Sequence, residues 1–208
     1  RRGRRWVCPA GLGLLCSVLV RPGTPVDAGW VPLATGLACA EALAATCHLP
    51  AAVKWPNDIV VPCADAPGWR KLGGVLCEST LTAGNGTAFD DAYIVVGIGL
   101  NLNHQACDLP ARVRTPPTSV LLETGSACDR RDVLRAILER VEERLLALYR
   151  PDSSTALKRR IEGQLRDWWP PERTLRVEAP AAKNGHARTV TGQFAGLDEH
   201  GRLLVRER

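Results

Sequence analysis

The side chains best suited to chemistry gather around Lys54, which opens the run Lys-Trp-Pro-Asn-Asp over residues 54–58. Only four of the 27 basic residues are lysines, and a lysine ammonium is a compact, mobile charge, unlike the flat guanidinium fork of arginine. Lys54 follows a short apolar run and precedes a Trp-Pro step, so we expect it at the exit of a strand, where α/β proteins often place binding groups. A strand followed by an ordinary turn is the alternative interpretation.

A second basic motif opens the chain, which reads Arg-Arg-Gly-Arg-Arg-Trp over residues 1–6. Arginines around a glycine let guanidinium groups and backbone amides converge on phosphate or carboxylate oxygens. Basic runs are common, however, and this segment taken alone favours a solvated terminus.

Two further motifs place glycines inside expected strands. Residues 71–76 read Lys-Leu-Gly-Gly-Val-Leu, and glycines in a strand indicate close approach of a ligand or a simple bulge. Residues 97–103 read Gly-Ile-Gly-Leu-Asn-Leu-Asn, in which Gly97 and Gly99 remove two side chains from one face and leave a flat slot for a planar ligand. Asn101 adds an amide that both donates and accepts hydrogen bonds, as recognition of a heterocycle edge requires.

In this order, the four motifs resemble those of the catalytic domain of biotin protein ligase, also called biotin–[acetyl-CoA-carboxylase] ligase. The resemblance runs across nearly the whole chain, and the pairing of K-W-P-N-D with G-x-G-x-N at this spacing is its most specific part. The opening motif matches only the second half of the family's arginine loop. We therefore interpret the chain as truncated at its N-terminus, and we expect it to bind biotin weakly and to ligate poorly beside a full-length parent.

The hydrophobic pattern predicts an α+β fold, with a mixed or antiparallel sheet and helices on one face. The expected strands cover residues 11–20, 51–55, 59–61, 72–81 and 92–102, with a glycine-rich hairpin turn at 83–87; the expected helices cover 31–49, 129–149 and 153–168. Asp129 or Asp132 is expected to cap the second helix, and Ser153 or Ser154 the third. The resemblance implies the class II synthetase-like fold of biotin and lipoate ligases.

A boundary is predicted at Pro170 and Pro171. Residues 1–169 are expected to form the catalytic domain without its N-terminal part. Residues 170–208 contain short strands at 174–177, 187–197 and 202–205, and they resemble part of an SH3-like β-barrel that is incomplete.

The resemblance implies an enzyme that activates biotin with ATP as biotinyl-5′-AMP and then transfers the biotinyl group to a lysine of a biotin carboxyl carrier protein. Two anions must meet in the first step, so fixed cations must offset their repulsion. The resemblance assigns catalytic roles to Arg1, Arg4 and Lys54. It assigns biotin contacts to Arg1, Trp6, Lys54, Gly97 and Gly99, and ATP contacts to Arg2, Arg4, Asn57 and Asn101. ATP implies Mg²⁺, for which Asn57 and Asp58 are candidate ligands only.

Composition argues against a membrane span, a zinc site and a disulfide framework. A net charge of +5 is modest, and no apolar run approaches the ~20 residues of a membrane span. Eight scattered cysteines without a C-x-x-C pair indicate neither a zinc site nor a disulfide framework, and they favour the cytoplasm. Cys16, Cys39 and Cys77 lie in apolar runs and are expected to be small buried hydrophobes.

The partner that the resemblance implies is a carrier subunit of an acetyl-CoA or acyl-CoA carboxylase. No membrane is expected, nucleic acid is not expected for these residues, and a homodimer is compatible with the family. Two alternatives stay open. One is a lipoate or octanoate ligase or transferase, which resembles this fold. The other is a non-catalytic biotin-binding or regulatory module, because some members of the family carry a DNA-binding helix-turn-helix ahead of the catalytic domain.

Overall fold

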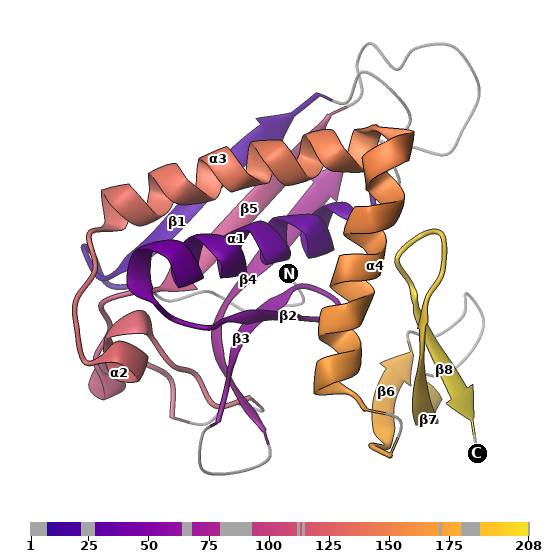
Figure 1. Cartoon of the computed structure of the whole chain (residues 1–208). Coiled ribbons are helices and arrows are strands. Elements are labelled where there is room, and N and C mark those ends of the chain that lie inside the picture. Colours follow the sequence, from indigo (N-terminus) through magenta and orange to yellow (C-terminus); the bar gives the residue numbers. More distant parts are fainter. Residues whose placement is uncertain are drawn as a thin grey trace.

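The computed structural model describes residues 8–21, 28–63, 68–79, 93–111, 113, 115–170, 172–179 and 188–207. These residues form a five-stranded sheet with helices on one face and a separate three-stranded sheet at the C-terminal end (Figure 1). The strand order of the larger sheet is β1-β5-β4-β3-β2, and each pairing is antiparallel. The predicted α+β class is therefore confirmed.

The strands of the larger sheet are β1 (Gly13–Val20), β2 (Ala52–Lys54), β3 (Asp58–Pro62), β4 (Trp69–Ser79) and β5 (Ile94–Asn101). The strand expected over 11–20 is confirmed as β1, and it is not a buried strand: β1 lies at the edge of the sheet, and its Leu15 and Leu19 are each 57% exposed. An antiparallel sheet covered on one face leaves alternate side chains open. The strand predicted from residue 72 begins earlier, at Trp69. The turn predicted at 83–87 lies outside the described residues.

The helices are α1 (Val31–Cys47), α2 (Val120–Thr124), α3 (Arg130–Tyr149) and α4 (Pro151–Trp168), with a 3-10 turn at Ala106–Asp108. The predicted cap of α3 is confirmed at Asp129, whose carboxylate accepts a hydrogen bond from the backbone N–H of Arg131. The predicted serine cap of α4 is wrong. The helix begins at Pro151, whose fixed φ angle suits the first helical turn and which has no N–H to satisfy.

The core lies between the larger sheet and the layer formed by α1 and α3, which cross the sheet in Figure 1. Of the three cysteines predicted to be buried, Cys39 is fully buried on α1, and burial raises the pKa of its thiol far above the ordinary value. Cys16 and Cys77 are half-buried and pack against the core, and burial raises the pKa of Cys77 to about 12. None of the three is suited to act as a nucleophile at neutral pH. No helix among the described residues is long and apolar enough to cross a membrane.

The smaller sheet contains β6 (Leu175–Ala179), β7 (Arg188–Leu197) and β8 (Leu203–Glu207), in that order, beside the end of α4 (Figure 1). The turn between β7 and β8, residues 198–201, meets two indole groups of the larger unit. Trp30 Nε1 donates to the carbonyl of Glu199 at 2.7 Å, and Trp55 Nε1 donates to the carbonyl of Gly201 at 3.0 Å. The three antiparallel strands are compatible with part of an SH3-like barrel, and the domain boundary at 169/170 stays a prediction.

We expect Gly201→Ala to weaken the contact between the turn at 198–201 and the indole groups of the larger unit. Gly201 has a φ of 70°, and a Cβ there would lie 3.0 Å from the carbonyl oxygen of Gly29, next to Trp30. Gly125 is a matched control, because its φ is 73° and a Cβ there would meet nothing within 4 Å. The left-handed backbone alone should lower the free energy of unfolding by about 1 kcal/mol in each variant. Denaturant titration should show a clearly larger loss for Gly201→Ala, and equal losses would contradict the prediction.

Candidate active site

A row of paired residues crosses the larger sheet at the level of Gly99. Leu15 on β1 pairs with Gly99 on β5, and Gly99 pairs with Gly74 on β4. Gly74 pairs in turn with Asp58 on β3, which pairs with Lys54 on β2. Residues directly opposite one another in an antiparallel sheet share a face. The row therefore runs from an apolar end, across two glycines, to a carboxylate and an ammonium group.

The row lies on the face of the sheet that α1 and α3 leave open. Along β5 the even-numbered residues from Ile94 to Leu100 are buried, whereas the odd-numbered residues between them are partly exposed. Gly97 and Gly99 belong to the partly exposed set, as their alternation predicts. The strand register adds Gly74 beside Gly99. We call Gly74, Gly97 and Gly99 the glycine floor, a flat area of sheet from which no side chain projects.

Two ammonium groups flank the carboxylate of Asp58 at one end of this floor. Lys71 Nζ donates a hydrogen bond to Asp58 Oδ1, and Lys54 Nζ lies 3.9 Å from Asp58 Oδ2. Lys71 Nζ is also 3.7 Å from the position that a Cβ would take on Gly74, whereas Lys54 Nζ lies over the ring of Trp69, 5.5 Å from its centroid. Lys71 is therefore the ammonium at the glycine floor, and Lys54 stands farther along the row. The cluster carries a net positive charge, which suits anionic ligands.

Lys71 was not among the predicted site residues, although it opens one of the four motifs. The scarcity of lysine that singled out Lys54 applies to it equally and could have found it. Its contact with Asp58 could not be predicted, because a register shift between Ile59 and Val60 sets which residue of β4 meets β3.

The two asparagines predicted to contact ATP bind the protein's own backbone. Asn57 follows a cis Trp55–Pro56 bond, and its Nδ2 donates to the carbonyl of Val75 at 2.6 Å. The N–H of Val75 donates back to the carbonyl of Asn57 at 2.9 Å, so this pair holds the turn between β2 and β3 against β4. Asn101 is only 5% exposed, and its Nδ2 donates to the carbonyl of Thr118 at 2.9 Å. Their ATP contacts stay predictions.

The remaining predicted residues, Arg1, Arg2, Arg4 and Trp6, lie outside the described residues, and their roles also stay predictions. The first described residue is Cys8, whose Sγ lies 2.5 Å from the position that a Cβ would take on Gly13. Gly13 pairs with Asn101. The described chain therefore enters the sheet at the Asn101 end of β5.

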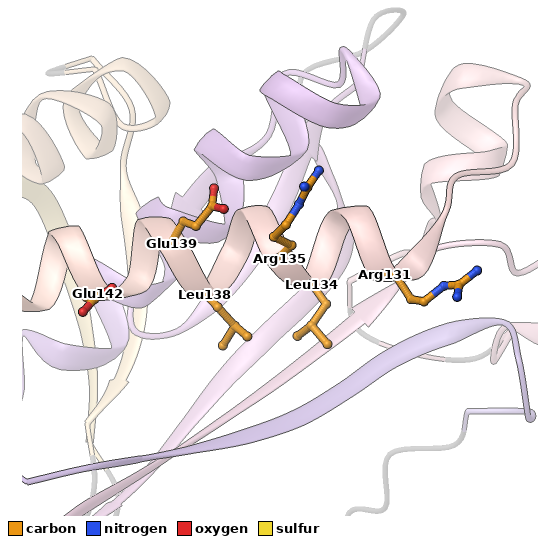
Figure 2. A pocket seen from close by; sticks show the side chains of 6 residues that line it. All are labelled: Arg131, Leu134, Arg135, Leu138, Glu139 and Glu142. Atoms are coloured by element: carbon orange, nitrogen blue, oxygen red, sulfur yellow. The ribbon is translucent and has the colours of Figure 1, made fainter.

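A shallow hollow also lies along α3, and Figure 2 shows Leu134 and Leu138 pointing to the same side of that helix. The residues that line it are Arg131, Leu134, Arg135, Leu138, Glu139 and Glu142. It belongs to the helix layer, which covers the face of the sheet opposite the glycine floor. Among the described residues no three His, Cys, Asp or Glu side chains come together as a metal site. We therefore place the candidate active site on the open face.

Comparison with known proteins gives consistent results. Residues 1–101 match the model of the biotin/lipoate A/B protein ligase family. The chain is 33% identical to the biotin–[acetyl-CoA-carboxylase] ligase of Paracoccus denitrificans, over 99% of this chain and 78% of that protein. The corresponding ligase of Mycobacterium tuberculosis is 30% identical, with 99% of this chain and 68% of that protein covered.

Longer relatives and a solved structure extend the comparison. The bifunctional ligase/repressor BirA of Bacillus spizizenii is 27% identical over 99% of this chain, which spans only 57% of that protein. The biotin protein ligase of Aquifex aeolicus, in complex with biotin and ATP, superposes with a TM-score of 0.74 at 28% identity, covering 99% of this chain and 75% of that one. The motifs, the fold and these matches agree, and the chain belongs to the biotin protein ligases within the biotin/lipoate A/B protein ligase family.

Proposed function

We propose that this protein activates biotin with ATP to form biotinyl-5′-AMP and then transfers the biotinyl group to a lysine of a biotin carboxyl carrier protein. The observation that carries the proposal is the pair of ammonium groups around Asp58, beside a floor that can accept a planar ring system. The relatives from Paracoccus and Mycobacterium are named for this ligation, and the Aquifex structure contains biotin and ATP.

In the first step a carboxylate oxygen of biotin attacks the α-phosphorus of ATP. The new P–O bond forms as the bond to the β-phosphate oxygen breaks, and pyrophosphate leaves with that electron pair. The attack brings two anions together, and fixed cations in a partly desolvated site lower its barrier. Lys71 lies at the floor and can donate to the carboxylate while it also donates to Asp58, because an ammonium group carries three N–H donors.

Lys54 was predicted as a catalytic residue that also contacts biotin, and it keeps a role in the proposal. Its Nζ lies 3.9 Å from the other carboxylate oxygen of Asp58, so it adds positive charge beside that carboxylate. Asp58 thereby positions both lysines, and the assignment of the larger share to Lys71 rests on its 3.7 Å distance from the Cβ position of Gly74.

The glycine floor would take the fused ring system of biotin. Leu15 on β1 and Leu76 on β4 lie beside it on the same face and are among the exposed large apolar residues. Removing such apolar surface from water would favour binding of the ring and the aliphatic chain. Arg1, Arg2 and Arg4 are proposed to contact biotin and phosphate, Trp6 to keep water from the mixed anhydride, and Asn57 and Asn101 to face the nucleotide.

In the second step the amine of a carrier lysine attacks the carbonyl carbon of biotinyl-5′-AMP. An amide bond forms, AMP leaves with the electron pair of the C–O bond, and the amine loses a proton. The carrier is proposed to be a domain of an acetyl-CoA or acyl-CoA carboxylase. A homodimer and a cytoplasmic setting stay proposals, and the free state of all eight cysteines supports the latter.

The candidate Mg²⁺ ligands do not fit a dedicated metal site. The carboxylate of Asp58 already faces two ammonium groups. That leaves the side-chain oxygen of Asn57, whose Nδ2 donates to the carbonyl of Val75, and one oxygen does not make a dedicated Mg²⁺ site. Mg²⁺ in nucleotide sites is usually held largely by the phosphates and water. We propose that Mg²⁺ enters as part of the ATP complex, as substrate.

Titration calorimetry and mass spectrometry test this function. We expect heat on addition of biotin but not of lipoate, and a mass corresponding to biotinyl-5′-AMP after incubation with biotin and ATP, which is detectable even when turnover is slow. Heat with lipoate alone would indicate a lipoate ligase. Biotin binding without any adenylate or pyrophosphate would indicate the non-catalytic binding module.

A further inference from the structure

A short segment that the four motifs do not include touches two of the proposed site residues at once. Residues 116–118, which we call the strap, run beside β4 and form a parallel bridge to Lys71. The N–H of Lys71 donates to the carbonyl of Pro116 at 2.7 Å, and the N–H of Thr118 donates to the carbonyl of Lys71 at 2.9 Å. The carbonyl of Thr118 accepts the bond from Asn101 Nδ2 at 2.9 Å. The strap thus connects the backbone of Lys71 with the amide of Asn101.

The strap is held by a carboxylate on α2. Glu123 has a side chain only 10% exposed, and it receives both arms of the Arg70 guanidinium, each at 2.7 Å. The hydroxyl of Thr118 donates to the same carboxylate. Burial alone would raise the pKa of Glu123, but the bonds from Arg70 and Thr118 outweigh it and hold the pKa below its ordinary value. A bidentate arginine–carboxylate pair is geometrically selective, so it defines orientation as well as adding energy.

The two partners of Glu123 lie close to Lys71, one on β4 and one on the strap. Arg70 immediately precedes Lys71 on β4, and Thr118 ends the strap. Glu123 therefore binds one residue of β4 and one residue of the strap, and these two lie on opposite sides of the bridge between Lys71 and the strap. Ser119 anchors the start of α2, since its Oγ accepts from the N–H of Leu122 at 3.1 Å and donates to the carbonyl of His104 at 2.6 Å.

We propose that Glu123, acting through Arg70 and Thr118, is a positioning residue that sets the separation of the Lys71 ammonium and the Asn101 amide across the active site. The inference rests on the proposed function, in which Lys71 meets the biotin carboxylate and Asn101 faces the nucleotide. Displacements of about 1 Å at reacting groups can lower rates by about a hundredfold, so fixing these two groups matters for adenylation.

The kinetic test compares Glu123→Gln with Glu41→Gln in the full chain. Glu41 is a matched control, because it forms a similarly buried ion pair with Arg144 between α1 and α3, on the covered side of the sheet. We expect both variants to lose stability, but only Glu123→Gln to lower kcat for adenylate formation, by about tenfold or more, and to raise KM for ATP. Thr118→Val should act in the same direction, and Thr118→Ser, which keeps the hydroxyl, should restore activity.

Amide hydrogen exchange tests the positioning role of Glu123 independently of whether the protein forms adenylate. The amides of Lys71 and Thr118 should exchange faster in Glu123→Gln and at the parent rate in Glu41→Gln, whether or not adenylate forms. Equal kcat in the two glutamine variants, full activity of Thr118→Val, or unchanged exchange at Lys71 would each overturn the inference. Failure of the unaltered chain to make adenylate would count against the proposed function. The exchange rates would still show whether Glu123 holds the backbone around Lys71 and Thr118.

Discussion

Replacing Lys71 by alanine is expected to lower the rate of biotinyl-5′-AMP formation by about a thousandfold, the upper range for loss of one preorganised donor at a developing charge. The reason is the place of its ammonium group, which donates to Asp58 and lies 3.7 Å from the Cβ position of Gly74 at the glycine floor. Lys54→Ala should lower the rate less, by about tenfold to a hundredfold, because Lys54 acts mainly through Asp58. Single-turnover assays of adenylate with saturating ATP would measure both rates.

Lys158→Ala is the control for loss of a lysine. Its ammonium lies over the ring of Trp30, 5.0 Å from the centroid, and it belongs to α4 rather than to the open face. Adenylation should continue at the parent rate in this variant. A larger loss for Lys54→Ala than for Lys71→Ala would reverse the two roles and make Lys54 the principal cation.

Filling the glycine floor should strongly weaken biotin binding while the fold persists. Gly97→Val places a branched side chain where the ring system would lie, and we expect a loss of affinity of at least about a hundredfold, in the upper part of the range that one methylene produces in an apolar pocket. The fold should tolerate the change, because a Cβ on Gly97 would find its nearest neighbour, the carbonyl oxygen of Leu76, at 3.4 Å. Valine also favours strands. Calorimetric titration with biotin and thermal unfolding would measure the two effects.

Val95→Thr is the matched control for this experiment. Val95 lies on β5, on the same open face as Gly97 and two residues away, and it already carries a branched side chain. Its replacement should leave biotin affinity within a few-fold of the parent value, as expected of a surface change away from the ligand. A Gly97→Val protein that still bound biotin like its parent would show that the ring system lies elsewhere.

Much of the fold follows from local rules that operate within a few residues. The periodic apolar residues of α3 predict that helix, and a capping carboxylate predicts its start at Asp129. The alternation of Gly97 and Gly99 likewise predicts a shared face. These features need no knowledge of what lies across the sheet.

The rest depends on contacts between distant residues. Gly73 and Gly74 are adjacent in one motif, yet a Cβ on Gly73 would lie 2.3 Å from the carbonyl oxygen of Gly99, whereas Gly74 belongs to the open floor. Alternation along β4 puts the two on opposite faces, but which of them lies on the open face follows from the strand register, which the bulge between β3 and β4 alters. The strap and α2 were not predicted either. Their stability comes from hydrogen bonds to Lys71 on β4, to Asn101 on β5 and to Leu102, and a five-residue helix has little stability of its own.

The two indole hydrogen bonds to the turn at 198–201 have a consequence for engineering. Trp55 is the immediate neighbour of Lys54, and its partner carbonyl at Gly201 is 146 residues away in the chain. A chimaera that took its C-terminal sheet from another ligase would change the surface against which the segment after β2 rests. Such a graft should therefore carry Trp30, Trp55 and the β7–β8 turn together as one interchangeable part.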